Sequence, residues 1–130
     1  MNVIDRKQTA QLWQEIISFY ETYPDDNWNL EPQIKIVKRI VDSEYGLELY
    51  PHTSHGALCI SITKDEKQSL EVPMVCVNYL SNQQVFEVKY WSRPFKTHDV
   101  FSKKCNQSEV WGLLESLFIR LQLESSTIAE

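Results

Sequence analysis

LEVPMVCVNYL-SNQQ-VFEVKYWS, residues 70–92, is the stretch that decides the fold. Apolar and polar side chains alternate along its two arms, and this period of two is typical of half-buried strands. The polar break at 81–84 predicts a turn, so the pattern indicates an antiparallel hairpin of strands 70–80 and 85–92. Because Pro73 cannot donate a ladder hydrogen bond, we expect the first strand to lie at a sheet edge or to carry a bulge.

Two shorter runs precede the hairpin and extend it to a four-strand meander. Residues 47–50 and 57–63 alternate in the same way. Polar breaks separate the runs at 52–56 and 64–67. After the hairpin we expect a connector of mixed charge, with room for one more short strand at 100–101.

Helical spacing of apolar residues predicts a helix on each side of the meander. Asp5 is expected to cap the first helix and Pro24 to end it, because proline disfavours helical geometry in the residue before it. In the last helix, Asn106 and Glu109 form a capping-box pair ahead of a wide apolar face that runs to Leu121.

Residues 32–45 have a pattern that fits either a helix or a strand. Ile34, Val37 and Ile40 follow helical spacing, whereas Ile34, Ile36 and Ile40 also fall on alternate positions. We prefer the helix, because Pro32 would then lie in its first turn and Gly46 just past its end.

Together these elements predict an α+β fold. The expected architecture is a two-layer sandwich, in which a four-strand antiparallel meander carries the N- and C-terminal helices on one face. The chain has 130 residues, which fits a single domain, 1–130. Residues from about 125 onward are expected to form a flexible tail.

Charge and composition narrow the function classes. The net charge of −5 disfavours binding to nucleic acid, which depends on Lys and Arg, and favours a basic partner. No run has the roughly 18 apolar residues of a membrane span. The first residues lack the pattern of a secretory signal, and the three cysteines form no C-x-x-C pair. We therefore expect a cytoplasmic protein with reduced thiols and no membrane partner.

Familiar catalytic patterns are weak in this sequence. His52 and His55 could share a metal ion, but they make only two of the four ligands of a structural zinc site, so no metal is expected. The three glycines form no phosphate-binding loop, and no cofactor is predicted. His98-Asp99 with a cysteine suggests a thiol relay, for which Cys105 is the accessible candidate. A non-enzyme is the preferred interpretation, and a small thiol-dependent enzyme is an alternative.

Aromatic and acidic residues favour protein binding. Of the four tryptophans, Trp13 and Trp111 lie beside apolar helix faces and are expected in the core or at its rim. Trp28, in an acidic loop, and Trp91, at a strand end, are better candidates for exposed binding anchors, because interface hot spots favour large amphipathic rings.

The whole chain resembles the small acidic immunity proteins of the contact-dependent inhibition type, which bacteria carry beside a toxin. The resemblance lies in the Asp25-Asp26-Asn27-Trp28 loop, the Tyr90-Trp91 strand end and the closing helix over 109–121. It implies a cytoplasmic inhibitor, monomeric when free, that neutralises one cognate toxin, often a nuclease, by blocking its active site or substrate surface. The expected partner-binding residues are Asp25, Asp26, Trp28, Glu31, Asp65, Glu66 and Trp91.

A second class of binding protein is also open. Acidic α+β chains of this size are similar to the dimeric chaperones that hold secreted effectors. That resemblance implies a homodimer with an exposed apolar groove.

Overall fold

The computed structural model describes residues 3–23, 29–54, 56–63, 72–92 and 100–129. Within these ranges the chain is α+β, as the sequence predicts. The helices are α1 Val3–Glu21, α2 Glu31–Asp42, α3 Tyr45–Glu48 and α5 Gln107–Ala129. The strands are β1 Tyr50–Ser54, β2 Ala57–Ser61, β3 Met74–Leu80, β4 Val85–Trp91 and β5 Val100–Cys105.

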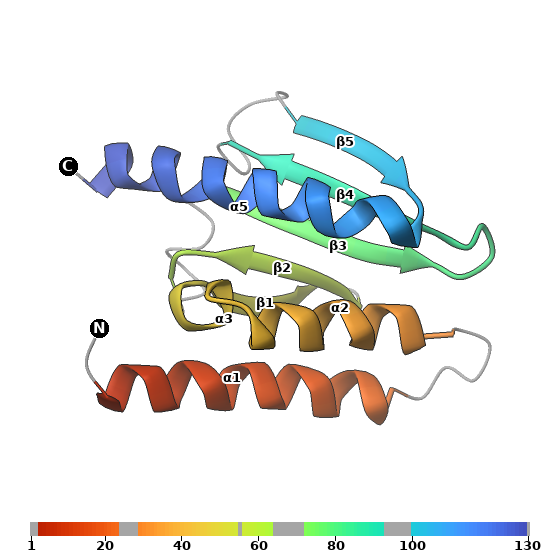
Figure 1. Ribbon diagram of the computed structural model, residues 1–130, viewed down its shortest axis with the longest axis horizontal. Coiled ribbons are helices and arrows are strands. Elements are labelled where there is room, and N and C mark those ends of the chain that lie inside the picture. Colours follow the sequence, from red (N-terminus) through yellow and green to blue (C-terminus); the bar gives the residue numbers. More distant parts are fainter. Residues whose placement is uncertain (1–2, 24–28, 55, 64–71, 93–99, 130) are drawn as a thin grey trace.

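The strands form one antiparallel meander in the order β1-β2-β3-β4-β5. The sequence predicts four strands, and the structure has five, because the short segment at 100–101 belongs to a full strand that runs to Cys105. Figure 1 shows α1 at the β1 end of the sheet and β5 at the opposite end, with α5 lying across β3 and β4.

The expected strand at 47–50 is wrong, because most of it is helical. Residues Tyr45–Glu48 form the short helix α3, and β1 begins only at Tyr50, so that His52 lies in a strand instead of a break. Gly46 allows this turn to pack closely on α2, since a Cβ at this position would lie 2.8 Å from the carbonyl oxygen of Ile40.

The expectation for Pro73 is also wrong. Strand β3 begins at Met74, one residue after the proline, and it lies in the centre of the sheet between β2 and β4. Since Pro73 precedes the ladder, its missing N–H removes no bond between strands.

The helices confirm most of the sequence pattern. Helix α2 confirms the preference for a helix in the ambiguous segment, with Pro32 in its first turn, but it ends at Asp42, so Gly46 lies inside α3 and not just past the end of α2. The capping box of α5 is present: Glu109 N donates to Asn106 Oδ1 at 3.1 Å, and Asn106 N donates to Glu109 Oε1 at 3.3 Å. Asp5, however, lies inside α1, which begins at Val3. The backbone of α5 continues to Ala129, past the point where we expected the tail.

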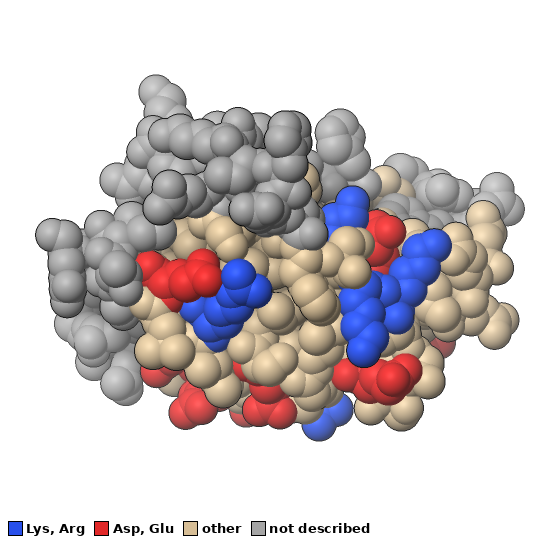
Figure 2. Space-filling view, turned by 90° about the horizontal axis from the view of Figure 1, so that it is seen from above, with Lys and Arg blue, Asp and Glu red and all other residues tan. Residues whose placement is uncertain are grey.

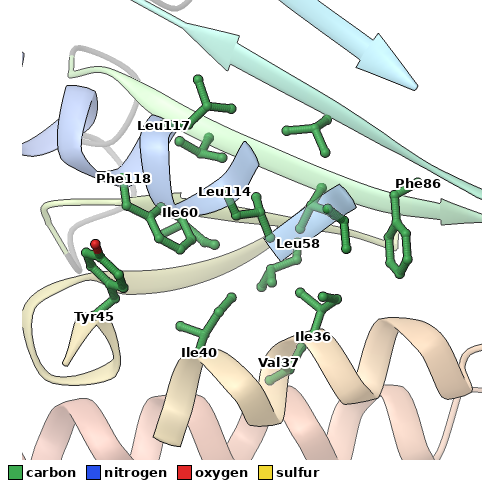
Figure 3. Close-up of a cluster of buried hydrophobic side chains, with 14 of the residues drawn as sticks. Ile36, Val37, Ile40, Tyr45, Leu58, Ile60, Phe86, Leu114, Leu117 and Phe118 are labelled. Carbon is green, nitrogen blue, oxygen red and sulfur yellow. The ribbon is translucent and has the colours of Figure 1, made fainter. Parts of the chain in front are cut away.

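The core lies between the helices and one face of the sheet. Along β3 and β4 every second side chain is buried, so that Val77, Val88 and Phe86 point toward the helices. Figure 3 shows Leu114, Leu117 and Phe118 of α5 and Ile36, Val37 and Ile40 of α2 meeting this face. We call this the core face, and the opposite side, which carries Cys59, Cys76, Lys89 and Trp91, the second face.

Gln33 is a fully buried polar residue in this core. Its Nε2 donates to the carbonyl oxygen of Val77 at 3.0 Å, and its Oε1 accepts from the N–H of Tyr79 at 2.9 Å. The ladder between β2 and β3 ends at Val77, where β2 starts after its turn. The amide of Gln33 therefore takes the place of strand β2 beyond that point and satisfies two backbone groups that would be buried without partners.

Tyr20 joins the same network from helix α1. Gln33 Nε2 donates to its hydroxyl oxygen at 3.2 Å, and the hydroxyl donates to the carbonyl oxygen of Gly56 at 2.9 Å. Gly56 has φ 85° in the turn between β1 and β2, a conformation that favours glycine. Two side chains thus connect α1, α2, this turn and β3.

Replacing Gln33 with methionine should strongly destabilise the protein. Methionine keeps a similar shape but leaves the N–H of Tyr79 and the carbonyl of Val77 unpaired, so the free energy of unfolding should fall by about 2–4 kcal/mol in urea titrations. The matched control is Gln14→Met on the exposed side of α1, which should change it by less than about 0.5 kcal/mol. Equal effects of the two variants would contradict the role of Gln33.

Tyr20 should make the protein sensitive to alkali. Burial raises the pKa of Tyr20 from 10.0 to about 12, against a smaller opposing effect of the bond from Gln33. Because the folded pKa is raised, the stabilisation is complete below pH ~10 and is lost as the pH rises toward 12. The fall in the free energy of unfolding from pH 9 to pH 11.5 should be about 2 kcal/mol smaller in Tyr20→Phe than in the wild type. Parallel curves for the two proteins would refute this assignment.

Candidate functional site

Most of the expected binding residues fall outside the part of the chain that the structure describes. These are Asp25, Asp26, Trp28, Asp65 and Glu66. Glu31 is described: it is exposed in the first turn of α2, where it forms an ion pair with Lys35 at 3.5 Å. Such an exposed pair contributes little to stability, so Glu31 remains available to a partner.

Trp91 is the last residue of β4 and is half-buried on the second face of the sheet. Its register partners are Met74 on β3 and Val100 on β5. Glu31 is the first residue of α2, and in Figure 1 this helix begins on the opposite side of the view from the end of β4. The structure therefore does not bring Glu31 and Trp91 together into one site.

Two other tryptophans lie where the sequence places them. Trp13 is fully buried, and its Nε1 donates to the carbonyl oxygen of Leu49 at 3.1 Å. Trp111 is half-buried at the rim of the core, with the guanidinium of Arg39 stacked 4.5 Å from its ring centroid. Arg39 thereby also covers part of the core.

Carboxylates flank an exposed leucine of α3 in the sequence. Leu47 is 41% exposed, and Asp42, Glu44 and Glu48 are exposed on either side of it in the chain. Glu115 of α5 is half-buried nearby and acts on Tyr45 together with Glu44 and Glu48. We call Asp42, Glu44, Leu47, Glu48 and Glu115 the α3 patch.

Three of the four carboxylates of the α3 patch act on one buried phenol. Burial, and after it the charges of Glu115, Glu44 and Glu48, raises the pKa of Tyr45 above its ordinary value of 10.0. Among the described residues, no ion pair within 4.0 Å neutralises the four carboxylates. The patch therefore offers four carboxylates that no paired cation neutralises within the described residues.

The α3 patch is held in place by its surroundings. The ring of Tyr45 packs on that of Phe118, with centroids 5.0 Å apart. Gln122 Nε2 donates to Glu48 Oε2 at 2.6 Å and so connects α3 to α5. Gly46 fixes the close approach of α3 to α2. Such support reduces the entropy lost when a partner binds.

Sequence reasoning missed this patch because it predicted a strand at 47–50. In a strand, Leu47 and Leu49 share one face, and both would be expected to be buried. In the structure Leu49 is buried and Leu47 is exposed, since the helical turn points them in different directions. The available signal was Asp42-Ser43-Glu44, three polar residues that interrupt the apolar period before Tyr45.

Cys105 does not have the accessibility that the expected thiol relay requires. Cys105, expected to be the accessible cysteine, is 4% exposed on the core face, where burial raises its pKa. That expectation is wrong, because the strand β5 turns Cys105 inward opposite Phe86. His52 Nε2 lies 2.9 Å from the carbonyl oxygen of Thr63. His55 and His98-Asp99 lie outside the described residues.

Within the described ranges, no three His, Cys, Asp or Glu side chains are grouped closely enough to hold a metal ion. None of the helices described here has the length and hydropathy to cross a membrane. Comparison with known proteins finds no matching family model, no matching curated protein and no matching solved structure.

The field of the α3 patch can be tested without a partner. Glu115→Gln should lower the pKa of Tyr45, because it removes the charge with the largest effect on this phenol after burial. NMR titration of ¹³C-labelled tyrosine side chains measures the change. Glu15→Gln, on the exposed side of α1, is the control and should leave the pKa of Tyr45 unchanged. A pKa that is the same in both variants would mean that the carboxylates do not act together.

Proposed function

We propose that this chain is a cytoplasmic immunity protein that binds and neutralises a cognate toxin, with a nuclease as the expected toxin class. The observation that carries the proposal is the α3 patch, which combines the exposed side chain of Leu47 with four carboxylates that form no ion pair among the described residues. The proposed action is to cover the active site or the substrate surface of the toxin, without chemistry by this chain.

The composition of the α3 patch suits a basic protein partner. An apolar centre with a polar rim is the common arrangement of protein interfaces. Nucleases hold the phosphate backbone with Lys and Arg, and carboxylates attract these same side chains. Complementary charge speeds association and disfavours wrong partners. The net charge of −5 adds to this attraction.

The residues first expected to bind the partner have different positions in this proposal. Asp25, Asp26, Trp28, Asp65 and Glu66 remain proposed contacts and lie outside the described residues. Glu31, at the start of α2, and Trp91, at the end of β4, do not belong to the α3 patch and are proposed as separate contacts. The α3 patch is therefore the first target for substitution.

Charge reversal in the α3 patch should abolish protection. The test protein is the toxic product of the gene next to the one for this chain. Co-expression of the wild type should restore growth of cells that make this toxin, and the purified proteins should bind with a Kd in the nanomolar range. Glu44→Lys/Glu48→Lys should weaken binding at least about tenfold, mainly through slower association.

The matched control is Glu15→Lys/Glu21→Lys, which makes the same change of charge on the exposed side of α1. It should keep most of the affinity and the protection. Equal losses in both double variants would mean that net charge, and not the α3 patch, governs binding. No binding and no protection by the wild type would overturn the proposed function itself.

An exposed apolar stripe on α5 favours a second candidate, the dimeric effector chaperone. Ile119 and Leu123 point outward at helical spacing and are 50% and 67% exposed. Light scattering on the free chain separates the candidates: a monomer agrees with the immunity protein, and a stable dimer favours the chaperone.

A further inference from the structure

Two cysteines lie side by side on neighbouring strands, on the same face of the sheet. Cys59 on β2 and Cys76 on β3 are direct register partners, and the thiol of Cys76 donates to the sulfur of Cys59 at a distance of 2.9 Å. Both side chains lie on the second face. Cys59 is 6% exposed, whereas Cys76 is more accessible.

The backbone places this pair within the range of a disulfide. Directly opposed residues of antiparallel strands have Cα atoms about 4.5–5.5 Å apart. Disulfides in proteins connect Cα atoms about 4.4–6.8 Å apart. The sulfur atoms need to approach by only about 1 Å to reach the bond length of about 2.05 Å. No strand has to move for a bond to form.

The surroundings of the pair prepare one of the two sulfurs for oxidation. The hydrogen bond from Cys76 lowers the pKa of Cys59, and the same bond, followed by burial, raises the pKa of Cys76. Lys89, the register partner of Cys76 on β4, adds a positive charge on the same face. A thiolate beside a protonated thiol is the arrangement in which an oxidised sulfur meets a second one that resolves it.

We propose that Cys59 and Cys76 form an oxidation site, at which peroxide converts the two thiols into a cross-strand disulfide that thiol reductants reopen. The Cys59 thiolate attacks one oxygen of hydrogen peroxide, which breaks the O–O bond and gives a sulfenic acid and hydroxide. The sulfur of Cys76 then attacks the sulfur of Cys59 and displaces the second oxygen. The two thiol protons leave with the oxygens, so two thiols and one peroxide yield one disulfide and two waters.

Cys105 takes no part in this reaction. It lies on the core face, so the sheet separates it from the pair. It provides an internal control, because all three cysteines are in one chain and only two of them are placed to react. The proposal is independent of any toxin or other partner.

The direct test uses the wild-type protein. After treatment with hydrogen peroxide, the thiols titrated in denaturant should fall from three to one, and dithiothreitol should restore them. Peptide mapping should find the segment with Cys59 joined to the segment with Cys76, with a loss of two hydrogen atoms. Because the bond closes a loop of moderate length in the unfolded chain, the midpoint of thermal unfolding should rise by about 5–15 °C.

Two variants identify the cysteines that form the link. Cys105→Ala should keep the link and the rise in thermal midpoint, whereas Cys76→Ser should lose both. Three thiols after peroxide, a link that involves Cys105, or sulfinic acid on Cys59 without a link would each overturn the proposal. The wild-type thiol count and peptide map decide the matter even where a variant folds poorly.

Discussion

The buried amide of Gln33 is the interaction on which the arrangement of helices and sheet depends. Strand β3 extends past the start of β2. On the side of β3 that faces β2, the backbone groups after Val77 would therefore have no partner beside the helical layer. The Gln33 side chain, which has one donor group and one acceptor group, lies beside these backbone groups and continues the ladder. The position of α2 on the sheet is thereby fixed by directional bonds, whereas apolar packing alone would allow it to slide.

The position of α2 on the sheet also sets the positions of the segments that follow this helix in the chain. Helix α2 held at this register delivers its C-terminal end to the turn at Gly46, and the turn presents Leu47 and its acidic neighbours outward. Figure 2, which looks at the molecule from the β5 side, shows Lys and Arg interspersed with Asp and Glu over the surface in view. The unpaired carboxylates of the α3 patch, by contrast, belong to the helical layer. The charges are thus distributed unevenly over the molecule, whereas the sequence alone gives only the net charge.

Local patterns in the sequence were sufficient for much of the fold. The alternation over 74–80 and 85–91, the capping box at Asn106 and the apolar face of the last helix each depend on neighbours in the chain, and each is confirmed. The failures concern long-range effects. The helical turn at Tyr45–Glu48 is stabilised by contacts with α2 and α5, and Cys105 is buried because β5 pairs with β4. Neither contact can be read from residues nearby. The pairing of Cys59 with Cys76 likewise requires the register of β2 on β3, which no periodicity supplies.

The two ends of the sheet differ in a way that limits how copies of this chain could assemble. The β1 end packs against α1, whereas β5 is paired, within the described residues, with β4 alone and carries the exposed lysines Lys103 and Lys104. The backbone of an edge strand is a template for pairing with another chain, and lysines on that strand disfavour such pairing. The two lysines therefore oppose the addition of a second sheet at β5.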